Sequence, residues 1–201
     1  MLRATILIPF LTGLSLTGPA GATVVGGAIT GGSAARNGEF VKLDPEDAFR
    51  VGQDTFQTEN LYAFDEDQNI TIPAPIEVDI GTGPQTGEVV ASHYVFFDPG
   101  SGRSQTGYVE FDAPIYGVAA QRGTMADSDY LANTQVTYLS PGARGLEGGD
   151  KVEIDPENPN RLLVNWAASS PGDYVRVFTR RSPLADAASG GKVPLSTLRR
   201  P

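Results

Sequence analysis

Residues 88–97 read Glu-Val-Val-Ala-Ser-His-Tyr-Val-Phe-Phe, which is the longest apolar run in the body of the chain. In a β-strand, successive side chains point to opposite faces. One face of this strand would carry Val89, Ala91, His93, Val95 and Phe97, and the other Val90, Ser92, Tyr94 and Phe96. Because both faces are mostly apolar, we expect a central strand that is covered on both sides.

Short runs of β-like composition continue on either side of this segment, separated by turn signals such as Ser140-Pro141-Gly142 and Ser170-Pro171-Gly172. One helical turn is expected at 126–132, and no alternation of strands with long helices is present. This pattern predicts an all-β fold, a single-domain antiparallel β-sandwich of the jelly-roll-like type. The predicted runs are 60–64, 69–72, 76–80, 88–97, 107–111, 115–119, 135–139, 151–154, 161–166 and 173–179.

The first 22 residues have the features of a secretory signal peptide. Arg3 precedes a mostly apolar stretch at 4–16, and Ala20-Gly21-Ala22 is a small-residue cleavage site. The apolar stretch is too short to span a bilayer. We therefore expect a mature chain that begins near Thr23, has no membrane span, and is secreted or held at the cell surface.

The two ends of the remaining chain differ in composition from its middle. Residues 23–38 are rich in Gly, Ala, Ser and Thr, so we expect a flexible leader with at most a short strand at 23–25. Residues 182–201 are also rich in small residues and are expected to form a flexible tail. The predicted β-sandwich domain then covers residues 39–181.

Composition excludes several functions. The chain has 24 acidic and 15 basic residues, a net charge of -9, and loss of Arg3 with the leader makes it -10. An acidic protein repels nucleic acid and anionic lipid, so hard cations and neutral sugars are better partners. With no cysteine and one histidine, thiol catalysis, iron–sulfur clusters and two-histidine zinc sites are excluded. We expect no nucleotide, because no G-x-G-x-x-G motif is present, and no haem.

The single histidine, His93, has two interpretations. As a general base it would need a carboxylate partner, for which Asp98 and Asp112 are candidates. As a structural residue its ring would bond to a neighbouring carbonyl or carboxylate. Ser92 would point to the opposite face of the strand, and no G-x-S-x-G motif is present. We favour the structural interpretation and name no catalytic residue.

An acidic segment follows the run at 60–64. Asp65, Asp67 and Asn69 carry oxygen donors at alternating positions, as at the start of a calcium-binding loop. The segment is not an EF-hand, because Ile70 and Ile76 stand where that motif has its glycine and its final glutamate. The alternative is a solvated turn. We predict Asp65, Asp67 and Asn69 as Ca²⁺ ligands.

The C-terminal residues Val193-Pro194-Leu195 and Arg199-Arg200 resemble the two ends of the sorting tails processed by exosortases, of the VPLPA or PEP-CTERM-like type. Ser196 stands where the second proline would be, and the apolar helix between the two ends is missing. Residues 60–66 and 92–99 are similar to uncharacterised exported β-rich bacterial proteins that carry such tails. The resemblance implies an envelope or matrix protein of a Gram-negative bacterium and supplies no activity.

Three functions are compatible with these features. The first is a non-enzymatic exported β-sandwich of the cell surface or extracellular matrix that binds calcium, a glycan or a surface polymer. The second is a secreted polysaccharide hydrolase that acts through two carboxylates, with Trp166 and the tyrosines as stacking surfaces. The third is a self-associating subunit whose leader 23–38 donates a strand to a neighbouring copy.

Overall fold

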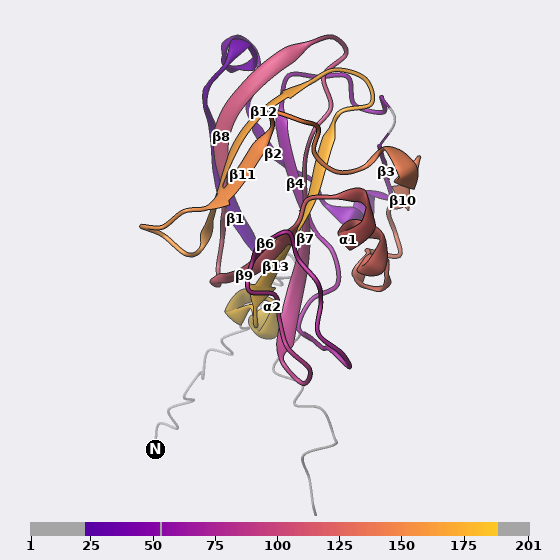
Figure 1. Ribbon diagram of the computed structural model, residues 1–201, viewed down its shortest axis with the longest axis vertical. Coiled ribbons are helices and arrows are strands. Elements are labelled where there is room, and N and C mark those ends of the chain that lie inside the picture. The colour runs from indigo at the N-terminus through magenta and orange to yellow at the C-terminus, as the bar shows by residue number, and fades with distance from the viewer. Residues whose placement is uncertain (1–22, 53, 189–201) are drawn as a thin grey trace, which may run out of the picture.

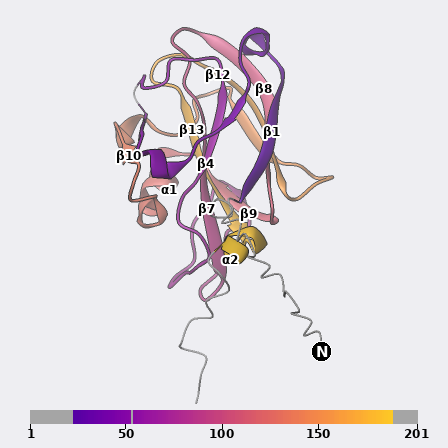
Figure 2. The ribbon, with the colours of Figure 1, turned by 180° about the vertical axis from the view of Figure 1, so that it is seen from behind.

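Two β-sheets stacked face to face form the body of the protein in the computed structural model, which describes residues 23–52 and 54–188. The smaller sheet is entirely antiparallel (Figures 1 and 2). Its strands, in spatial order, are β1 (Val24–Gly31), β8 (Arg103–Phe111), β12 (Arg161–Ala168) and β11 (Lys151–Ile154).

The larger sheet is antiparallel except where β2 and β4 pair in parallel. Its strand order is β2 (Phe40–Lys42), β4 (Leu61–Asp65), β7 (Val89–Phe97), β13 (Asp173–Arg180), β9 (Ile115–Ala119) and β6 (Ile80–Gly81), and β5 (Ile70–Thr71) pairs with β7 off this path. The expected all-β sandwich is therefore confirmed.

Strand β7 is covered on both faces, as its composition predicts. Val95 and Phe97 belong to a core between the two sheets, whereas Tyr94 and Phe96 belong to a second core on the outer face of the larger sheet. The inner core is completed by alternate residues of β8 and β12, among them Val109, Leu162 and Trp166. The outer core is rich in aromatic rings that contact one another edge to face or stacked.

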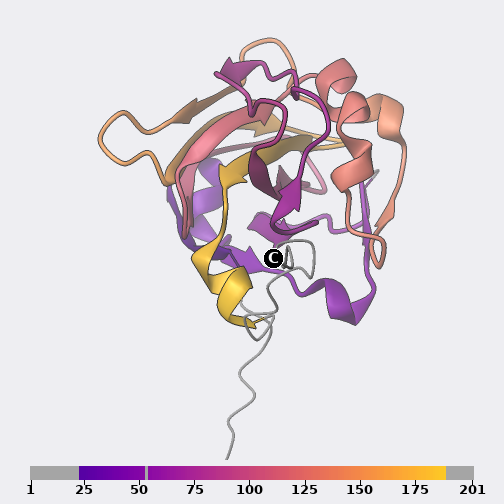
Figure 3. The ribbon, with the colours of Figure 1, turned by 90° about the horizontal axis from the view of Figure 1, so that it is seen from below.

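A third, partial layer covers the outer face of the larger sheet. Figure 1 shows α1, β3 and β10 to the right of β7 and β13, away from β1, β8 and β11, and Figure 3 shows the same separation from below. This layer contributes Met125 and Leu131 to the outer core. It consists of α1 (Arg122–Asp127), the 3-10 turns η3 (Asp129–Leu131) and η4 (Pro141–Ala143), and the parallel pair β3 (Arg50–Val51) and β10 (Thr137–Tyr138).

The prediction of a flexible leader at 23–38 is wrong for most of those residues. Residues 24–31 form β1, which pairs with β8, and the 3-10 turn η1 (Ser33–Arg36) follows. The glycines that suggested flexibility allow close packing instead: a Cβ on Gly27 would lie 2.5 Å from the Phe40 ring and 2.7 Å from the Tyr108 carbonyl oxygen. The leader is therefore part of the sandwich.

Other boundaries also differ from the predicted ones. The expected helical turn at 126–132 is α1 followed by η3, and it begins at Arg122. Of the predicted strand 76–80, only Ile80 lies in β6. The expected flexible tail includes the helix α2 (Pro183–Ala188). Residues 189–201, which carry the sorting-tail resemblance, and residues 1–22, which carry the predicted signal peptide, lie outside the described residues. The turn η2 (Pro45–Asp47) lies between β2 and β3.

Candidate functional site

A buried polar cluster forms where β4, β7 and β13 lie side by side on the inner face of the larger sheet. His93 is fully buried, with its Nδ1 2.8 Å from Asp65 Oδ1 and its Nε2 3.0 Å from Thr179 Oγ1. The Thr23 hydroxyl donates to the same Asp65 oxygen at 2.9 Å. Burial alone would raise the pKa of Asp65, but His93, Lys42 and Thr23 together lower that pKa to about 2. Asp65 is therefore held as a carboxylate.

This cluster resembles a hydroxyl–histidine–carboxylate triad, but its enclosure rules out that function. Thr23, His93 and Thr179 are each completely buried, so no substrate reaches the hydroxyl groups. The expected structural role of His93 fits this geometry. The partners considered for it from sequence, Asp98 and Asp112, are elsewhere engaged: Asp98 accepts from the Phe56 N–H and Asp112 from Ser182 Oγ.

A second cluster lies on the outer face, directly behind the first. Arg176 Nε donates to Glu66 Oε2 at 2.6 Å, and neither side chain is exposed to solvent. Glu66 also accepts from Ser92 Oγ at 2.7 Å and from the Tyr138 hydroxyl at 2.6 Å. Arg176 Nη1 donates to the Met125 carbonyl oxygen. Burial opposes the charge of the guanidinium, but Glu66 raises the pKa of Arg176 above its usual value. The cluster attaches the third layer to the sheet.

The ion pairs continue to the surface through Asp129. Arg176 Nη1 lies 3.0 Å from Asp129 Oδ1, and Arg144 donates to both oxygens of Asp129 at 2.7 and 2.8 Å. Paired guanidinium and carboxylate groups of this kind hold their planes in a fixed orientation. Arg144 is nearly buried and forms part of the wall of a surface pocket.

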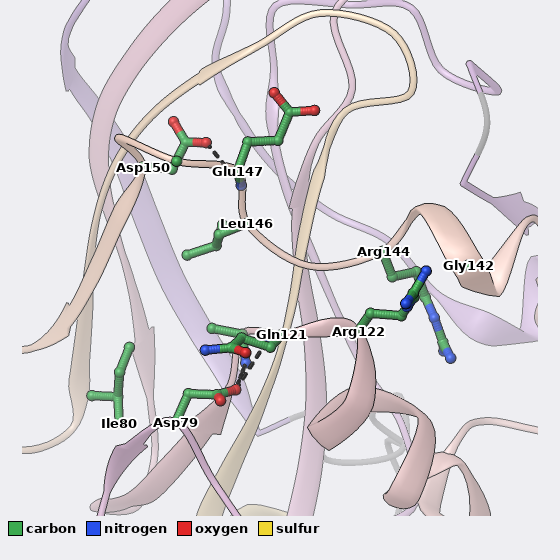
Figure 4. Close-up of a pocket in the computed structure, with 11 residues that line it drawn as sticks. Asp79, Ile80, Gln121, Arg122, Gly142, Arg144, Leu146, Glu147 and Asp150 are labelled. Atoms are coloured by element: carbon green, nitrogen blue, oxygen red, sulfur yellow. Dashed lines mark hydrogen bonds between the residues drawn. The ribbon is translucent and has the colours of Figure 1, made fainter.

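This pocket, with a volume of about 660 Å³, opens between the start of α1, the segment after η4, and the loop before β11 (Figure 4). Its lining combines carboxylates, guanidinium groups, an amide, glycines and a few apolar side chains. The lining residues are Asp79, Ile80, Ala120, Gln121, Arg122, Gly142, Arg144, Leu146, Glu147, Gly148 and Asp150.

Most polar groups of the pocket have internal partners. Asp79 Oδ2 accepts from the Ala120 and Gln121 N–H groups at 2.7 and 2.9 Å and from Thr124 Oγ1, so this carboxylate fixes the start of α1. Asp150 accepts from the Ala167 and Glu147 N–H groups. Within residues 23–52 and 54–188, by contrast, the exposed side chains of Arg122 and Glu147 make no hydrogen bond or ion pair. They are the groups available to a ligand.

Asp173, at the start of β13, is a further unusual acid that the sequence analysis does not single out. It is 1% exposed, and in the described part of the chain its Oδ2 has no hydrogen-bond partner. Burial, and then the charges of Asp150 and Glu147, raise the pKa of Asp173 to about 7. The bridge between Gly145 and Tyr174 brings the loop of Glu147 alongside β13, and this long-range pairing has no signal in the sequence.

The three predicted calcium ligands do not converge. Asp65 is directed to His93 and Thr23, and Asn69 Nδ2 and Oδ1 bond to the Ser182 carbonyl oxygen and N–H. Burial and the neighbouring Glu66 raise the pKa of Asp67. Among the described residues, no group of three or more His, Asp or Glu side chains is arranged to hold a metal ion. The calcium site stays a prediction.

Comparisons with protein-family models, with curated proteins and with solved structures found no match. Within the described part of the chain, no helix is long and apolar enough to cross a membrane. The aromatic residues considered as sugar-stacking surfaces lie mostly in the two cores: Trp166, Tyr62, Tyr94 and Tyr174 are buried, and Tyr130 is 53% exposed.

Proposed function

We propose that this protein is an exported, non-enzymatic β-sandwich module of the cell surface or extracellular matrix, and that its pocket between α1 and β11 binds a neutral glycan. The observation that carries the proposal is the pocket itself, whose wall includes the side chains of Arg122 and Glu147, both without a hydrogen-bond or ion-pair partner among the described residues. The Arg122 guanidinium can donate hydrogen bonds to a ligand, and the Glu147 carboxylate can accept them.

The chemistry of the lining favours a polyhydroxylated ligand. Each sugar hydroxyl both donates and accepts a hydrogen bond, and the lining offers guanidinium donors, carboxylate acceptors and the Gln121 amide, which does both. The volume of about 660 Å³ lies in the range of small-molecule sites. None of the described residues that line the pocket is aromatic, so recognition rests on hydrogen bonds rather than on stacking. The excess of acidic residues disfavours a polyanionic ligand.

We propose no catalytic activity because the two clusters with chemically suitable groups lie away from the pocket. The arrangement of Thr23, His93 and Asp65 is enclosed between the sheets. The pair of Glu66 and Arg176 is equally buried and has its hydrogen-bonding capacity filled by protein groups. Neither cluster reaches a ligand in the pocket.

A carboxylate-dependent hydrolase is the second candidate, and one observation favours it. Asp173, with its pKa of about 7, has the protonation behaviour of a general acid, and Asp150 and Glu147 are close enough to influence it. Asp173 does not line the pocket, however, so it lacks the contact with substrate that the reaction requires. The binding function is therefore supported better. Strand donation by the leader receives no support from this arrangement, because β1 pairs with β8 of its own chain.

Isothermal titration with a panel of neutral oligosaccharides tests the proposal. We expect Arg122→Ala and Glu147→Gln to weaken binding about tenfold each, the effect of losing a charged hydrogen bond of about 1.4 kcal/mol. Arg36→Ala and Glu39→Gln are matched controls, because both residues are exposed outside the pocket and should leave affinity unchanged. Binding that is unaffected by the two pocket variants, or absent for every oligosaccharide, would overturn the proposal.

A further inference from the structure

The first described residue, Thr23, is completely buried, and its main-chain nitrogen lies 3.0 Å from Asp65 Oδ2. The Thr23 hydroxyl donates to Asp65 Oδ1, and the Val24 N–H donates to the same oxygen at 3.0 Å. One carboxylate therefore receives three hydrogen bonds from two consecutive residues at the start of β1. These bonds fix the start of β1 to Asp65 of β4.

Other charged groups around Thr23 come from three neighbouring strands. Lys42 Nζ, from β2, lies 3.2 Å from Asp65 Oδ2, and His93, from β7, contacts Asp65 Oδ1. Asp112, which follows β8, donates its N–H to the Thr23 carbonyl oxygen at 2.9 Å. The Asp112 Oδ1 is buried and has no partner in the part of the chain that the structure describes. Asp65 is thus contacted by both Lys42 and His93, whereas no salt bridge among the described residues reaches Asp112.

We propose that Thr23 is the N-terminal residue of the mature protein and that its α-ammonium group forms a buried ion pair with Asp65. Two independent observations meet at this residue. The small-residue site Ala20-Gly21-Ala22 places the cut directly before Thr23, and the fold directs the Thr23 nitrogen at a carboxylate. The inference rests on the export assumed in the proposed function.

The covalent step is hydrolysis by a leader-cleaving endopeptidase with one water molecule. The amide bond between the Ala22 carbonyl carbon and the Thr23 nitrogen breaks. The water oxygen stays on Ala22 as part of a carboxylate, and the Thr23 nitrogen leaves as an amine that is protonated to an ammonium. Because Thr23 is buried in the folded domain, cleavage precedes closure of β1 onto the sandwich.

The ion pair is stronger than the bond that an uncleaved chain makes. An amide N–H offers a neutral donor to Asp65, whereas an ammonium offers a charged one, and hydrogen bonds between ionised groups are shorter and stronger. Cleavage also adds a positive charge at the Thr23 nitrogen, which lies 3.0 Å from Asp65 Oδ2. Removal of the leader therefore stabilises the domain that it delivers.

The test compares two forms of the otherwise identical protein. One begins with a free amine at Thr23, released from a fusion partner without extra residues, and the other retains Gly21 and Ala22. We expect the free form to melt about 3 °C or more above the extended form, the shift that about 1 kcal/mol produces in a domain of this size. The difference in melting temperature between the two forms should disappear in Asp65→Asn. It should persist in Glu59→Gln, because the Glu59 carboxylate pairs with Arg103 and not with Thr23. Equal melting temperatures for the two wild-type forms would overturn the inference.

Labelling of the amine gives a readout that holds even where Asp65→Asn does not fold. With an amine-selective reagent at neutral pH, the α-amine of the folded free form should react at least about tenfold more slowly than in urea, because reaction requires local opening. The exposed Lys151 is the internal control and should react alike in both conditions. Rapid labelling of the α-amine in the folded protein would contradict the ion pair. Both experiments use recombinant protein, so their failure is distinct from a failure of export or of glycan binding.

Discussion

Glu66 and Arg176 are separated by 110 residues in the chain and meet as an ion pair with both side chains fully buried. The pair lies on the outer face of the larger sheet, where Arg176 also holds the Met125 carbonyl oxygen and Ser128 Oγ. A charge pair in such a place is stable only because protein groups bond to its polar atoms, as Ser92, Tyr138 and Met125 do here. It joins the third layer, which forms one wall of the pocket, to the sandwich.

Breaking this pair should be costly. Arg176→Met leaves the Glu66 charge buried without its partner, so we expect the free energy of unfolding to fall by about 3–5 kcal/mol. Chemical denaturation measures the change. Arg161→Met is the matched control, because Arg161 and its partner Glu110 are both partly exposed and its second partner, Asp155, also accepts from the Glu157 N–H, and it should cost about 1 kcal/mol or less. Equal losses in the two variants would contradict the structural role assigned to Glu66 and Arg176.

Asp173 should make the stability of the protein fall as pH rises. Its folded pKa of about 7 exceeds its ordinary value of 3.8, so its contribution to stability is complete below about pH 4 and is lost as pH increases through 7. At pH 8 we expect Asp173→Asn to be more stable than the wild type by up to about 4 kcal/mol, and at pH 4 to differ little. Thermal melts at both pH values provide the measurement. Asp44→Asn, at an exposed turn, should show no such gain.

His93 should matter for stability and not for binding. His93→Gln removes a fully buried ring that contacts Asp65 and Thr179, so we expect a loss of about 1–3 kcal/mol. Oligosaccharide affinity, measured at a temperature where the variant is folded, should be unchanged because His93 lies between the sheets and the pocket lies at the surface. If His93→Gln kept a normal melting curve but lost oligosaccharide binding, the structural interpretation of His93 would be wrong.

Export is tested by the mass of the protein recovered from a bacterium that expresses the full chain. We expect the protein in the periplasm or medium to begin at Thr23, as read by intact-mass spectrometry and N-terminal sequencing. An untrimmed species beginning at Met1, retained in the cytoplasm, would contradict both export and the maturation inferred at Thr23.

The sequence predicted the central strand well because its signal is local. The alternation in 88–97 indicated burial on both faces, and it placed Ser92 and His93 on opposite sides, where they contact Glu66 and Asp65. The prediction of a flexible leader at 23–38 fails because a high glycine content is typical both of flexible segments and of closely packed strands. The neighbours that distinguish the two, such as Phe40 beside Gly27, are set by the fold.

The polar sites were less predictable because their partners are distant in sequence. The spacing of its neighbours predicts Asp65 as a calcium ligand, yet its bonds reach Lys42 and His93 on other strands and Thr23 just before β1. The raised pKa of Asp173 depends in the same way on a loop brought alongside by one bridge to Tyr174. The spacing of residues along a strand shows which face of the sheet a side chain occupies. It does not show which residues of other strands or loops contact that side chain.

Glycan binding in the pocket is tested most directly by a nuclear magnetic resonance titration of the ¹⁵N-labelled protein with the neutral oligosaccharide that binds best. We expect chemical-shift changes confined to the pocket, at Gln121, Arg122 and the segment 147–150, with the oligosaccharide itself unchanged after prolonged incubation. Shifts elsewhere would contradict the site. Shortened oligosaccharides that appear with wild type and not with Asp173→Asn would contradict the non-enzymatic function and establish the hydrolase in its place.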